Sequence, residues 1–210
     1  MRTSFWQKER DLDLDQKEPM GIMKNVSFEM KKRNLSDVLE LGCGRGRNCI
    51  WLARENFSVT GIDYNLRDLI LLKDYVSPHG IPMNIVQNDV SALSFRENTF
   101  DVVLSLHVLT YIREEMRTKV AEEVKRVLRP EGLFVAVERS PKDPLYKQGR
   151  EIEKETYLLQ GIAHHFFSAQ EFQTLLEPME IAVIKESRTF DTSHDHLHIH
   201  GMWLVVAVNK

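Results

Sequence analysis

The most constraining feature of this chain is an apolar run that ends in closely spaced glycines, followed about 20 residues later by an acidic residue that ends a second apolar run. The first run reads VLELGCGRGRN from Val38 to Asn48, and the second reads VTGIDYN from Val59 to Asn65. A strand that ends in a glycine-rich turn and opens a helix presents bare backbone N–H groups and a helix N-terminus to a ligand. An acid at the tip of the next strand can hold a ribose. The pair therefore indicates a nucleotide-type cofactor.

The length and charge of the chain limit its class. Its 210 residues include 28 Lys or Arg and 31 Asp or Glu, which gives a net charge of −3. This length fits one α/β domain of about 200 residues with a full hydrophobic core, so we expect a single domain over residues 1–210. The composition lacks the basic excess of nucleic-acid-binding proteins, and we do not expect a nucleic-acid partner. A monomer or a homodimer is expected.

The cysteines and the apolar runs indicate in which cellular compartment the protein is expected. The only cysteines are Cys43 and Cys49, and two cysteines at this spacing cannot complete a tetrahedral zinc site alone, so no metal is expected. The first 19 residues are charged throughout, and no apolar run approaches the ~20 residues that span a bilayer. We expect a soluble cytoplasmic protein with reduced thiols and no membrane contact.

Strand-like runs alternate with helical patterns, as in a parallel sheet covered on both faces. Strands are expected at residues 37–41, 58–63, 84–87, 100–106 and 133–138. Helices are expected at residues 48–55, 66–76 and 113–128. The last helix is predicted to stop at Arg129-Pro130-Glu131-Gly132, because proline cannot continue a helix and glycine permits the turn.

The two ends of the chain differ from this regular part. Residues 139–167 carry prolines, glycines and charges in place of a strand, and we expect a long substrate-lining insertion there. A helix is predicted from the N-cap Ser168 to about Leu176, followed by antiparallel strands at 181–190 and 198–208. Residues 1–34 are expected to form a helical segment that folds over the cofactor as a lid, or an arm that packs one helix on the sheet.

The glycine register separates two cofactor classes. A dinucleotide fingerprint reads G-x-G-x-x-G, whereas this chain reads Gly42-Cys43-Gly44-Arg45-Gly46-Arg47. The third glycine comes one residue early, and Arg47 stands where the nicotinamide pattern has its last glycine. A nicotinamide oxidoreductase therefore remains only an alternative.

The E-x-G-x-G-x-G pattern from Glu40 to Gly46 resembles motif I of the class I S-adenosylmethionine-dependent methyltransferases. FDVVLSLHVLTYI, residues 100–112, and RVLRPEGLFVAVE, residues 126–138, resemble later motifs of that family. The resemblance implies S-adenosyl-L-methionine as the cofactor and methyl transfer as the reaction. It also implies an α/β fold with a Rossmann-like seven-stranded, mostly parallel sheet, one antiparallel C-terminal strand and helices on both faces. Residues 156–176 resemble the tellurite-resistance and thiol-modifying branch of small-molecule methyltransferases.

By this resemblance, Asp63 would bond the ribose hydroxyls, Tyr64 would pack on the adenine and Asp89 would accept from the adenine amino group. The glycines would let the backbone approach the methionine tail, whose ammonium Glu40 would meet directly or through water. The full set of expected cofactor contacts is Glu40, Gly42, Cys43, Gly44, Gly46, Asp63, Tyr64, Asp89, Val90 and Ser105.

Each acidic residue in this set has an alternative role. Glu40 can be a solvated carboxylate at the end of a strand. Asp63 can cap the helix predicted from Leu66. Asp89 can be a turn residue.

Ligands of open α/β sheets lie outside the carboxyl ends of the strands, which places the substrate near residues 105–111 and 138–140. His107 and Tyr111 are candidate catalytic groups that act as a base or orient a nucleophile, with cofactor-edge packing as the alternative for His107. The expected substrate-lining residues are Glu138, Arg139, Tyr157, His164, His165, His198 and His200. Phe166, Phe167 and one of the adjacent histidines can instead be core and surface residues.

Four histidines alternate near the C-terminus, at positions 194, 196, 198 and 200. They would share one face of a strand, so metal binding is an alternative to an edge hairpin with exposed histidines.

The acceptor class is predicted from a missing motif. No Asn/Asp-Pro-Pro-Tyr/Phe sequence, which clamps a planar nitrogen in base methyltransferases, follows the strand at 100–106. We therefore expect transfer to an O, N, S or metalloid atom of a small molecule. A protein or RNA substrate and a non-catalytic S-adenosylmethionine-binding module remain alternatives.

Overall fold

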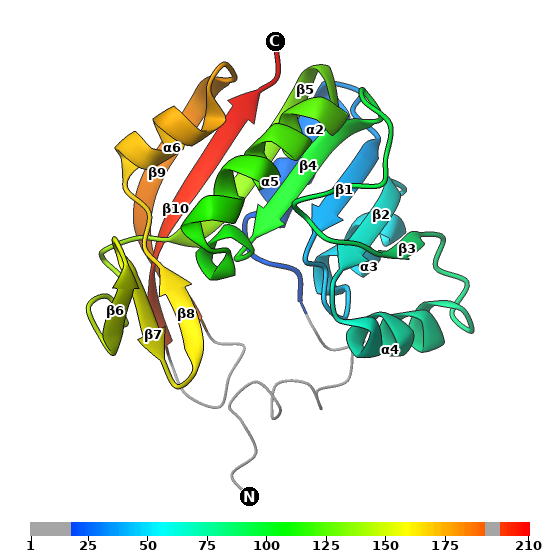
Figure 1. Cartoon of the computed structure of the whole chain (residues 1–210). Coiled ribbons are helices and arrows are strands. Elements are labelled where there is room, and N and C mark those ends of the chain that lie inside the picture. The colour runs from blue at the N-terminus through cyan, green and yellow to red at the C-terminus, as the bar shows by residue number, and fades with distance from the viewer. Residues whose placement is uncertain (1–17, 192–197) are drawn as a thin grey trace, which may run out of the picture.

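The computed structural model describes residues 18–191 and 198–210, and within them seven strands form one sheet (Figure 1). The strand order is β3-β2-β1-β4-β5-β10-β9. β10 runs antiparallel to both of its neighbours, and the pairs among β1 to β5 are parallel. The predicted fold class is confirmed. The strands are β1 (Asp37–Leu41), β2 (Ser58–Asp63), β3 (Asn84–Gln87), β4 (Phe100–Leu106), β5 (Leu128–Arg139), β9 (Glu180–Asp191) and β10 (His198–Val208).

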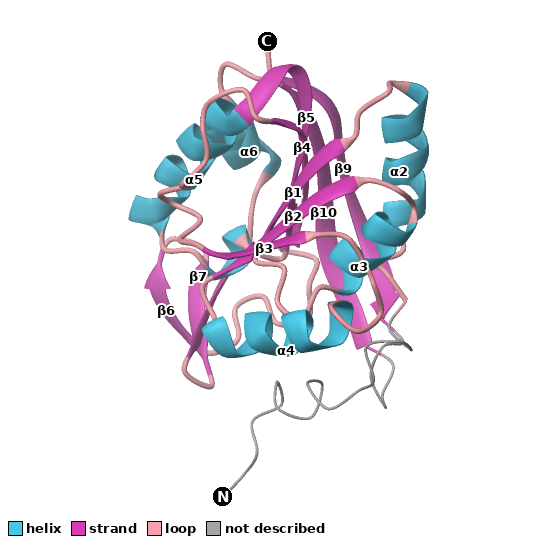
Figure 2. Cartoon of the chain, turned by 90° about the vertical axis from the view of Figure 1, so that its right-hand side faces the viewer, coloured by secondary structure: helices cyan, strands magenta, loops and turns pink. Residues whose placement is uncertain are grey.

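Helices cover both faces of the sheet, as Figure 2 shows with α5 and α6 on one side and α2 and α3 on the other. Alternate residues of β1 explain this: Val38 packs with α2, α3 and α4, whereas Leu39 packs with α5 and α6. The helices are α2 (Met23–Lys32), α3 (Arg47–Arg54), α4 (Leu66–Val76), α5 (Glu114–Val127) and α6 (Ala169–Leu176). In the described part of the chain, every helix falls short of the length and apolar character needed to cross a membrane.

The junction of α5 and β5 refines a predicted boundary. α5 ends at Val127, one residue from the predicted end, but β5 begins at once with Leu128 paired to Phe100. The register then shifts, because Leu133 pairs with Val102 and residues 129–132 form the irregularity between the two pairings. The stretch Arg129-Pro130-Glu131-Gly132 therefore follows the end of the helix as predicted and also interrupts the strand.

Residues 139–167 contain strands, which corrects the expectation of an insertion without them. β6 (Arg150–Glu153), β7 (Thr156–Leu159) and β8 (Ile162–His165) form an antiparallel three-stranded sheet, called the meander below. Each strand is four residues long and lies in a segment rich in charges, prolines and glycines, so no strand pattern stands out there. A two-residue loop joins β7 to β8, with Gln160 at φ 52° and Gly161 at φ 84°, a combination typical of tight hairpins.

The described part of the predicted N-terminal lid is a packed helix. Met23 and Met30 of α2 are fully buried against the sheet. The backbone N–H of Met20 donates to Asn48 Oδ1 at 2.9 Å, which ties this segment to the start of α3. Residues 1–17, on which the rest of the lid prediction falls, lie outside the described residues.

Candidate active site

The glycine loop between β1 and α3 combines a packed glycine with an open one. Gly46, the N-cap of α3, has φ +81°, and a Cβ there would lie 2.5 Å from Leu72 Cδ1. Gly44 has φ +54°, and a Cβ there would meet nothing within 4 Å. The loop therefore packs closely against α4 at Gly46 and leaves free space above the backbone at Gly44, as a site for a bound molecule requires. Gly42 is exposed at the end of β1.

Asp63 joins the end of β2 to this loop. Its Oδ2 accepts from the backbone N–H of Gly44, and its Oδ1 accepts from that of Asn65, both at 2.8 Å. The alternative role of Asp63 as a helix cap is wrong, because Asn65 is the N-cap of α4 and its side chain accepts from Arg67 N. The Asp63 side chain is partly exposed, so it retains acceptor capacity beside the open backbone of Gly44.

Tyr64 and Asp89 follow the carboxyl ends of β2 and β3. The Tyr64 side chain is free of packing, since the residue is 82% exposed. Asp89 is exposed, and its Oδ1 accepts from Ser91 N at 2.8 Å and from Ser91 Oγ at 2.7 Å, which lowers the pKa of Asp89. This is the turn role considered above, and it leaves Oδ2 available. Val90 is partly buried and packs against the core on the α5 side.

Glu40 lies behind the glycine loop rather than in solvent. It is only 3% exposed, so its alternative role as a solvated carboxylate is wrong. Its Oε1 accepts from Asn48 Nδ2 and its Oε2 from Cys49 Sγ, both at 2.8 Å. Burial raises the pKa of Glu40 and that of the Cys49 thiol. Cys43 is also buried, and its backbone N–H donates to Ile62 O.

Glu138 organises the segment after β4 and has no exposed surface. Its Oε1 accepts from Ser105 Oγ at 2.8 Å, from Leu109 N at 3.0 Å and from Val108 N at 3.2 Å. Its Oε2 accepts from the backbone N–H and the hydroxyl of Thr110, each at 2.9 Å. One carboxylate thus fixes the conformation of residues 108–110, which include the 3₁₀ turn η2 (Leu109–Tyr111).

This network corrects two expected contacts. Ser105 and Glu138 are completely buried, so neither reaches a bound molecule in this conformation, and both act by holding their neighbours. Burial raises the pKa of Glu138 to about 7, although its hydrogen bonds favour the ionised form. The candidate catalytic residues His107 and Tyr111 flank the segment that Glu138 holds. His107 has φ +64°, and its N–H donates to Val137 O at 2.8 Å.

The meander brings its histidines to the same edge of the sheet. The rings of Tyr111 and His164 meet edge to face, with centroids 5.4 Å apart. His164 is 6% exposed, and its Nδ1 has no hydrogen-bond partner in the described residues. Burial and the nearby positive charge of Arg139 lower the pKa of His164 to about 4, so the ring is neutral at neutral pH.

Arg139 follows Glu138 at the end of β5 and is buried in an ion pair. Its Nη1 lies 2.7 Å from Asp143 Oδ2 and 3.4 Å from His200 Nδ1. His200 Nδ1 is also 3.3 Å from Asp143 Oδ2. The backbone N–H of Arg139 donates to Thr110 Oγ1, which joins this group to the segment held by Glu138. Arg139, His164, His200 and Tyr111 therefore gather at one place.

His165 and Tyr157, both expected to line the substrate site, have structural contacts instead. His165 Nδ1 lies 2.9 Å from Thr156 Oγ1, and its Nε2 lies 2.9 Å from the Glu171 carboxylate, so the ring joins the meander to α6. Tyr157 is buried against Tyr146 and Phe166. Both histidines of the pair are buried, so neither is the surface residue considered above.

The alternating histidines are only partly placed. His194 and His196 lie outside the described residues, as does the side chain of His198. Among the described residues, no cluster of three His, Cys, Asp or Glu side chains is arranged to hold a metal ion.

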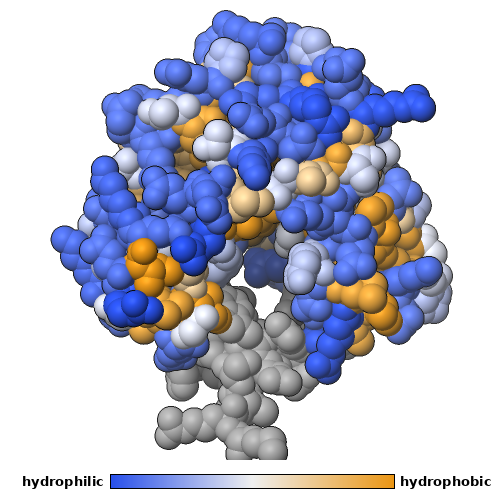
Figure 3. Space-filling model, viewed as in Figure 1, coloured by the Kyte–Doolittle hydropathy of each residue, from blue (hydrophilic) through white to orange (hydrophobic). Residues whose placement is uncertain are grey.

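Figure 3 shows a hollow in the molecular surface between the meander and the region of α4. The carboxyl ends of β1 and β4 point toward this side of the molecule (Figure 1). This is where open α/β sheets bind their ligands.

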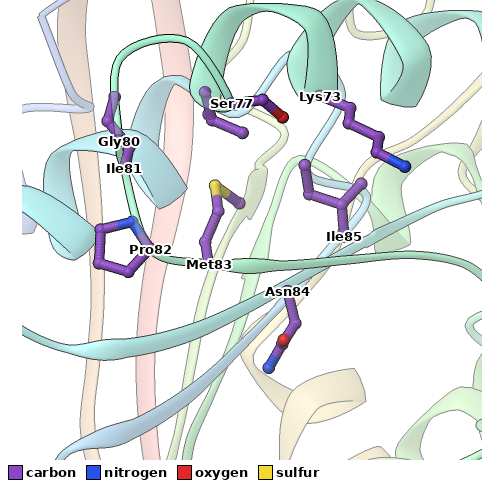
Figure 4. A pocket seen from close by; sticks show the side chains of 9 residues that line it. Lys73, Ser77, Gly80, Ile81, Pro82, Met83, Asn84 and Ile85 are labelled. Carbon is purple, nitrogen blue, oxygen red and sulfur yellow. The ribbon is translucent and has the colours of Figure 1, made fainter.

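A separate cavity of about 320 Å³ lies at the opposite end of the sheet (Figure 4). It includes Asn84, the first residue of β3, and so lies at the amino end of that strand, away from the glycine loop. Its lining is Lys73, Val76, Ser77, Gly80, Ile81, Pro82, Met83, Asn84 and Ile85. Its position gives it no part in the site described above.

Comparison with known proteins identifies the part of the chain that carries the glycine loop and the segment after β4. Residues 39–136 match the methyltransferase domain family. The matched segment is just under half of the chain, so the similarity is that of this segment to the family. The match includes the glycine loop, Asp63, Asp89 and the segment after β4. The predicted relation to the S-adenosylmethionine-dependent methyltransferases and the predicted cofactor, S-adenosyl-L-methionine, are confirmed at the level of the family.

Individual relatives of the methyltransferase domain agree with this assignment. The uncharacterized methyltransferase YodH of Bacillus subtilis is 30% identical over 108 residues, which are 51% of this chain and 45% of YodH. TehB of Haemophilus influenzae, a probable S-adenosyl-L-methionine-dependent methyltransferase, is 27% identical over 88 residues, which are 42% of this chain and 30% of TehB. The chain thus spans less than half the length of these two curated relatives.

The fold is shared over nearly the whole chain with a solved structure. A crystal structure of a SAM-dependent methyltransferase from Methanosarcina mazei superposes with a TM-score of 0.76 at 22% identity. The match covers 92% of this chain and 99% of that chain.

Sequence reasoning missed two residues that support the methyltransferase domain's candidate site. Asn48 links Glu40 to the N-terminal segment, and its position two residues after Gly46 was the available signal. Asp143 pairs with Arg139 from within a Pro-rich stretch, SPKDP, where no periodic pattern marks it. Arg139 and Asp143 are only four residues apart, so their pairing depends on the turn between them, which no periodic pattern predicts.

Proposed function

We propose that this protein is a cytoplasmic methyltransferase that uses S-adenosylmethionine to methylate an O, N, S or metalloid atom of a small molecule. The observation that carries the proposal is the glycine loop. Its backbone at Gly44 faces free space and donates a hydrogen bond to Asp63, the last residue of the adjacent strand β2. Such a loop suits a cofactor without a pyrophosphate, because the backbone can come close to a methionine tail.

The residues at this edge fit the proposed cofactor. Asp63 has acceptor capacity for ribose hydroxyls, and the exposed ring of Tyr64 offers a flat apolar surface for an adenine. Asp89 retains a free oxygen beyond its turn contacts with Ser91, to accept from an exocyclic amino group. When bound, the cofactor supplies a methyl group on a positively charged sulfur. The protein then has to exclude water and align the nucleophile.

The acceptor is proposed to lie between the segment after β4 and the meander. Tyr111 and His164 are in contact there, and His107 precedes η2 in a conformation held by backbone and Glu138 contacts. We propose that His107 and Tyr111 orient the nucleophile. A thiolate or metalloid acceptor needs no protein base, because positioning alone supplies much of the rate acceleration.

Asp63→Ala tests the cofactor assignment. We expect the variant to lose about 1.5–3 kcal/mol of binding free energy for S-adenosylmethionine, since hydrogen bonds to an ionised group disappear. Isothermal titration calorimetry with the cofactor and with its demethylated product measures the loss. Asp74→Ala, an exposed aspartate on α4, is the matched control and should bind as the wild type does. Equal affinities in two folded variants would refute the ribose assignment.

The reaction itself is tested by label transfer. The protein is incubated with methyl-labelled cofactor and panels of thiols, phenols, amines and metalloid oxyanions. Transfer to one class supports the proposal and names the acceptor atom. Tight cofactor binding without transfer to any acceptor would favour a non-catalytic module, and absence of cofactor binding would refute the proposed function.

A further inference from the structure

One edge of the Arg139 guanidinium has no hydrogen-bond partner among the described residues. Nη1 is engaged by Asp143 and His200, as described above. Nε is buried and has no partner in residues 18–191 and 198–210, and the described hydrogen bonds of Arg139 include none at Nη2. Nε and Nη2 lie on one edge of the planar group, and their two parallel N–H bonds match the two oxygens of a carboxylate.

His164 provides a second unpaired atom at the same place. Its Nδ1 is buried and, like Nε of Arg139, is without a partner in the described part of the chain. The ring packs on Tyr111, which follows Thr110, and Thr110 Oγ1 accepts from the backbone N–H of Arg139. Buried polar atoms normally have hydrogen-bond partners. Two buried atoms without one, on separate strands, therefore point to a bound group that the protein alone does not supply.

We propose that Arg139 and His164 bind a carboxylate of the methyl acceptor. The inference rests on the proposed function and names its substrate class: a small molecule that carries a carboxylate apart from the atom to be methylated. Arg139 ends β5 and Tyr111 follows β4, so the group lies at the carboxyl edge of the sheet, with the glycine loop. The meander, which contributes His164, forms one side of the hollow in Figure 3.

Asp143 binds Nη1 of Arg139 and leaves the edge formed by Nε and Nη2 available to a ligand. Its carboxylate accepts from Gly201 N at 3.2 Å and Leu145 N at 2.9 Å as well as from Arg139 Nη1, so it is held by the backbone on the far side of the guanidinium. Arg139 is thereby fixed in orientation with its Nε edge turned away from Asp143. The neutral His164 ring adds a hydrogen-bond donor in its Nδ1–H tautomer without adding charge.

Formate and formamide are the probes that test the site. Both are planar and similar in size, but only formate has a negative charge and two equivalent acceptor oxygens. The full-length protein is titrated with each by NMR, with chloride keeping the ionic strength constant, and the signals of the Arg139 Nε–H and of the His164 ring are followed. We expect a saturable shift with formate and none with formamide. Equal responses would indicate a site for water or any small polar group and would overturn the proposal.

Sulfate supplies a third arm. A tetrahedral anion cannot satisfy both in-plane donors and His164 in the way a carboxylate does, so we expect a weaker response at equal concentration. Sulfate binding as strong as formate binding would show a general anion site and would also overturn the assignment.

Variants localise the response. Arg139→Gln is expected to weaken formate binding at least about tenfold, because the bidentate charged donor is lost. Arg150→Gln, an exposed arginine of the meander, is the matched control and should bind formate as the wild type does. If Arg139→Gln fails to fold, the double variant R139Q/D143N removes both charges while keeping polar partners. A formate response that survives in either folded variant refutes the site.

The titration is performed with and without the demethylated cofactor. Formate binding does not require the cofactor, so failure of the proposed function appears as loss of cofactor affinity with an intact formate response. Failure of the present inference appears as loss of the formate response with intact cofactor affinity.

Discussion

The Glu138→Gln variant is expected to be destabilised by about 2–4 kcal/mol at pH 5, because an amide cannot accept all the hydrogen bonds that the carboxyl group accepts. Glu138 receives donors at both oxygens, from Ser105 and from residues 108–110. A glutamine has one oxygen, and its NH₂ group, unlike the hydroxyl oxygen of a protonated carboxyl group, cannot accept from the N–H donors that face it. Buried N–H groups would be left without acceptors, and the segment after β4 would lose its anchor.

The destabilisation is expected to depend on pH in a defined direction. The pKa of Glu138 is raised from 4.5 to about 7 by burial, so between these values the folded protein holds a proton that the unfolded chain has released. The stability that this proton confers is fully present below pH 4.5 and is lost as the pH rises through about 7. The wild type should lose about 1.4 kcal/mol per pH unit from this group, and the variant should not. The difference in the free energy of unfolding between the wild type and the variant is therefore expected to decrease from pH 5 to pH 8.

Urea unfolding of both proteins at pH 5, 6, 7 and 8 measures this gap, and titration of the other groups cancels in the difference. Glu122→Gln, on the exposed face of α5, serves as the control and should change stability little at any pH. A gap that is constant from pH 5 to pH 8 would mean that Glu138 does not titrate in this range.

Gly201→Ala is expected to destabilise the protein by more than about 3 kcal/mol. A Cβ at Gly201 would lie 2.1 Å from Asp143 N and 2.2 Å from Lys142 C, which are backbone atoms that cannot rotate away. The same glycine accepts from Ser140 N and donates to Asp143 Oδ2, so β10 would have to separate from residues 140–143. The Arg139–Asp143 pair would be disturbed as well.

The free energy of unfolding from urea titration, together with the melting temperature, tests this expectation. Gly21→Ala is the matched control, because a Cβ there meets nothing within 4 Å. We expect that control to remain within about 1 kcal/mol of the wild type. A similarly small effect for Gly201→Ala would show that the loop after β5 can move away from β10 at little cost.

The sheet was predictable from the sequence because its strands are buried on both faces. Leu39 and Val103 pack on one side and Val38 and Val102 on the other, so β1 and β4 read as continuous apolar runs. The cofactor loop was predictable for a related reason, since Gly46 is required by a positive φ and a close neighbour. Constraints of this kind act on neighbouring residues, so they are visible in the sequence as apolar runs and as glycines at fixed positions.

The roles of several site residues depend on contacts that no local pattern records. Glu138 ends an apolar strand, where a carboxylate can face either a ligand or the adjacent segment. In the structure, residues 108–110 lie over the end of β5 and donate their backbone N–H groups to Glu138, so this carboxyl group faces the adjacent segment. His165 was predicted to line the substrate site, but in the structure its Nε2 lies beside the Glu171 carboxylate of α6. Such roles are set by tertiary pairing.

The hydrogen bonds from Met20 N to Asn48 Oδ1 and from Asn48 Nδ2 to Glu40 Oε1 form a relay between the N-terminal segment and the end of β1. The amide hydrogen of Met20 is therefore a natural reporter. Its exchange with deuterated solvent requires the Met20–Asn48 bond to open, so the exchange rate measures how firmly the start of the described chain is docked on the glycine loop. Any ligand that rigidifies that loop should slow exchange at a residue outside the matched methyltransferase domain.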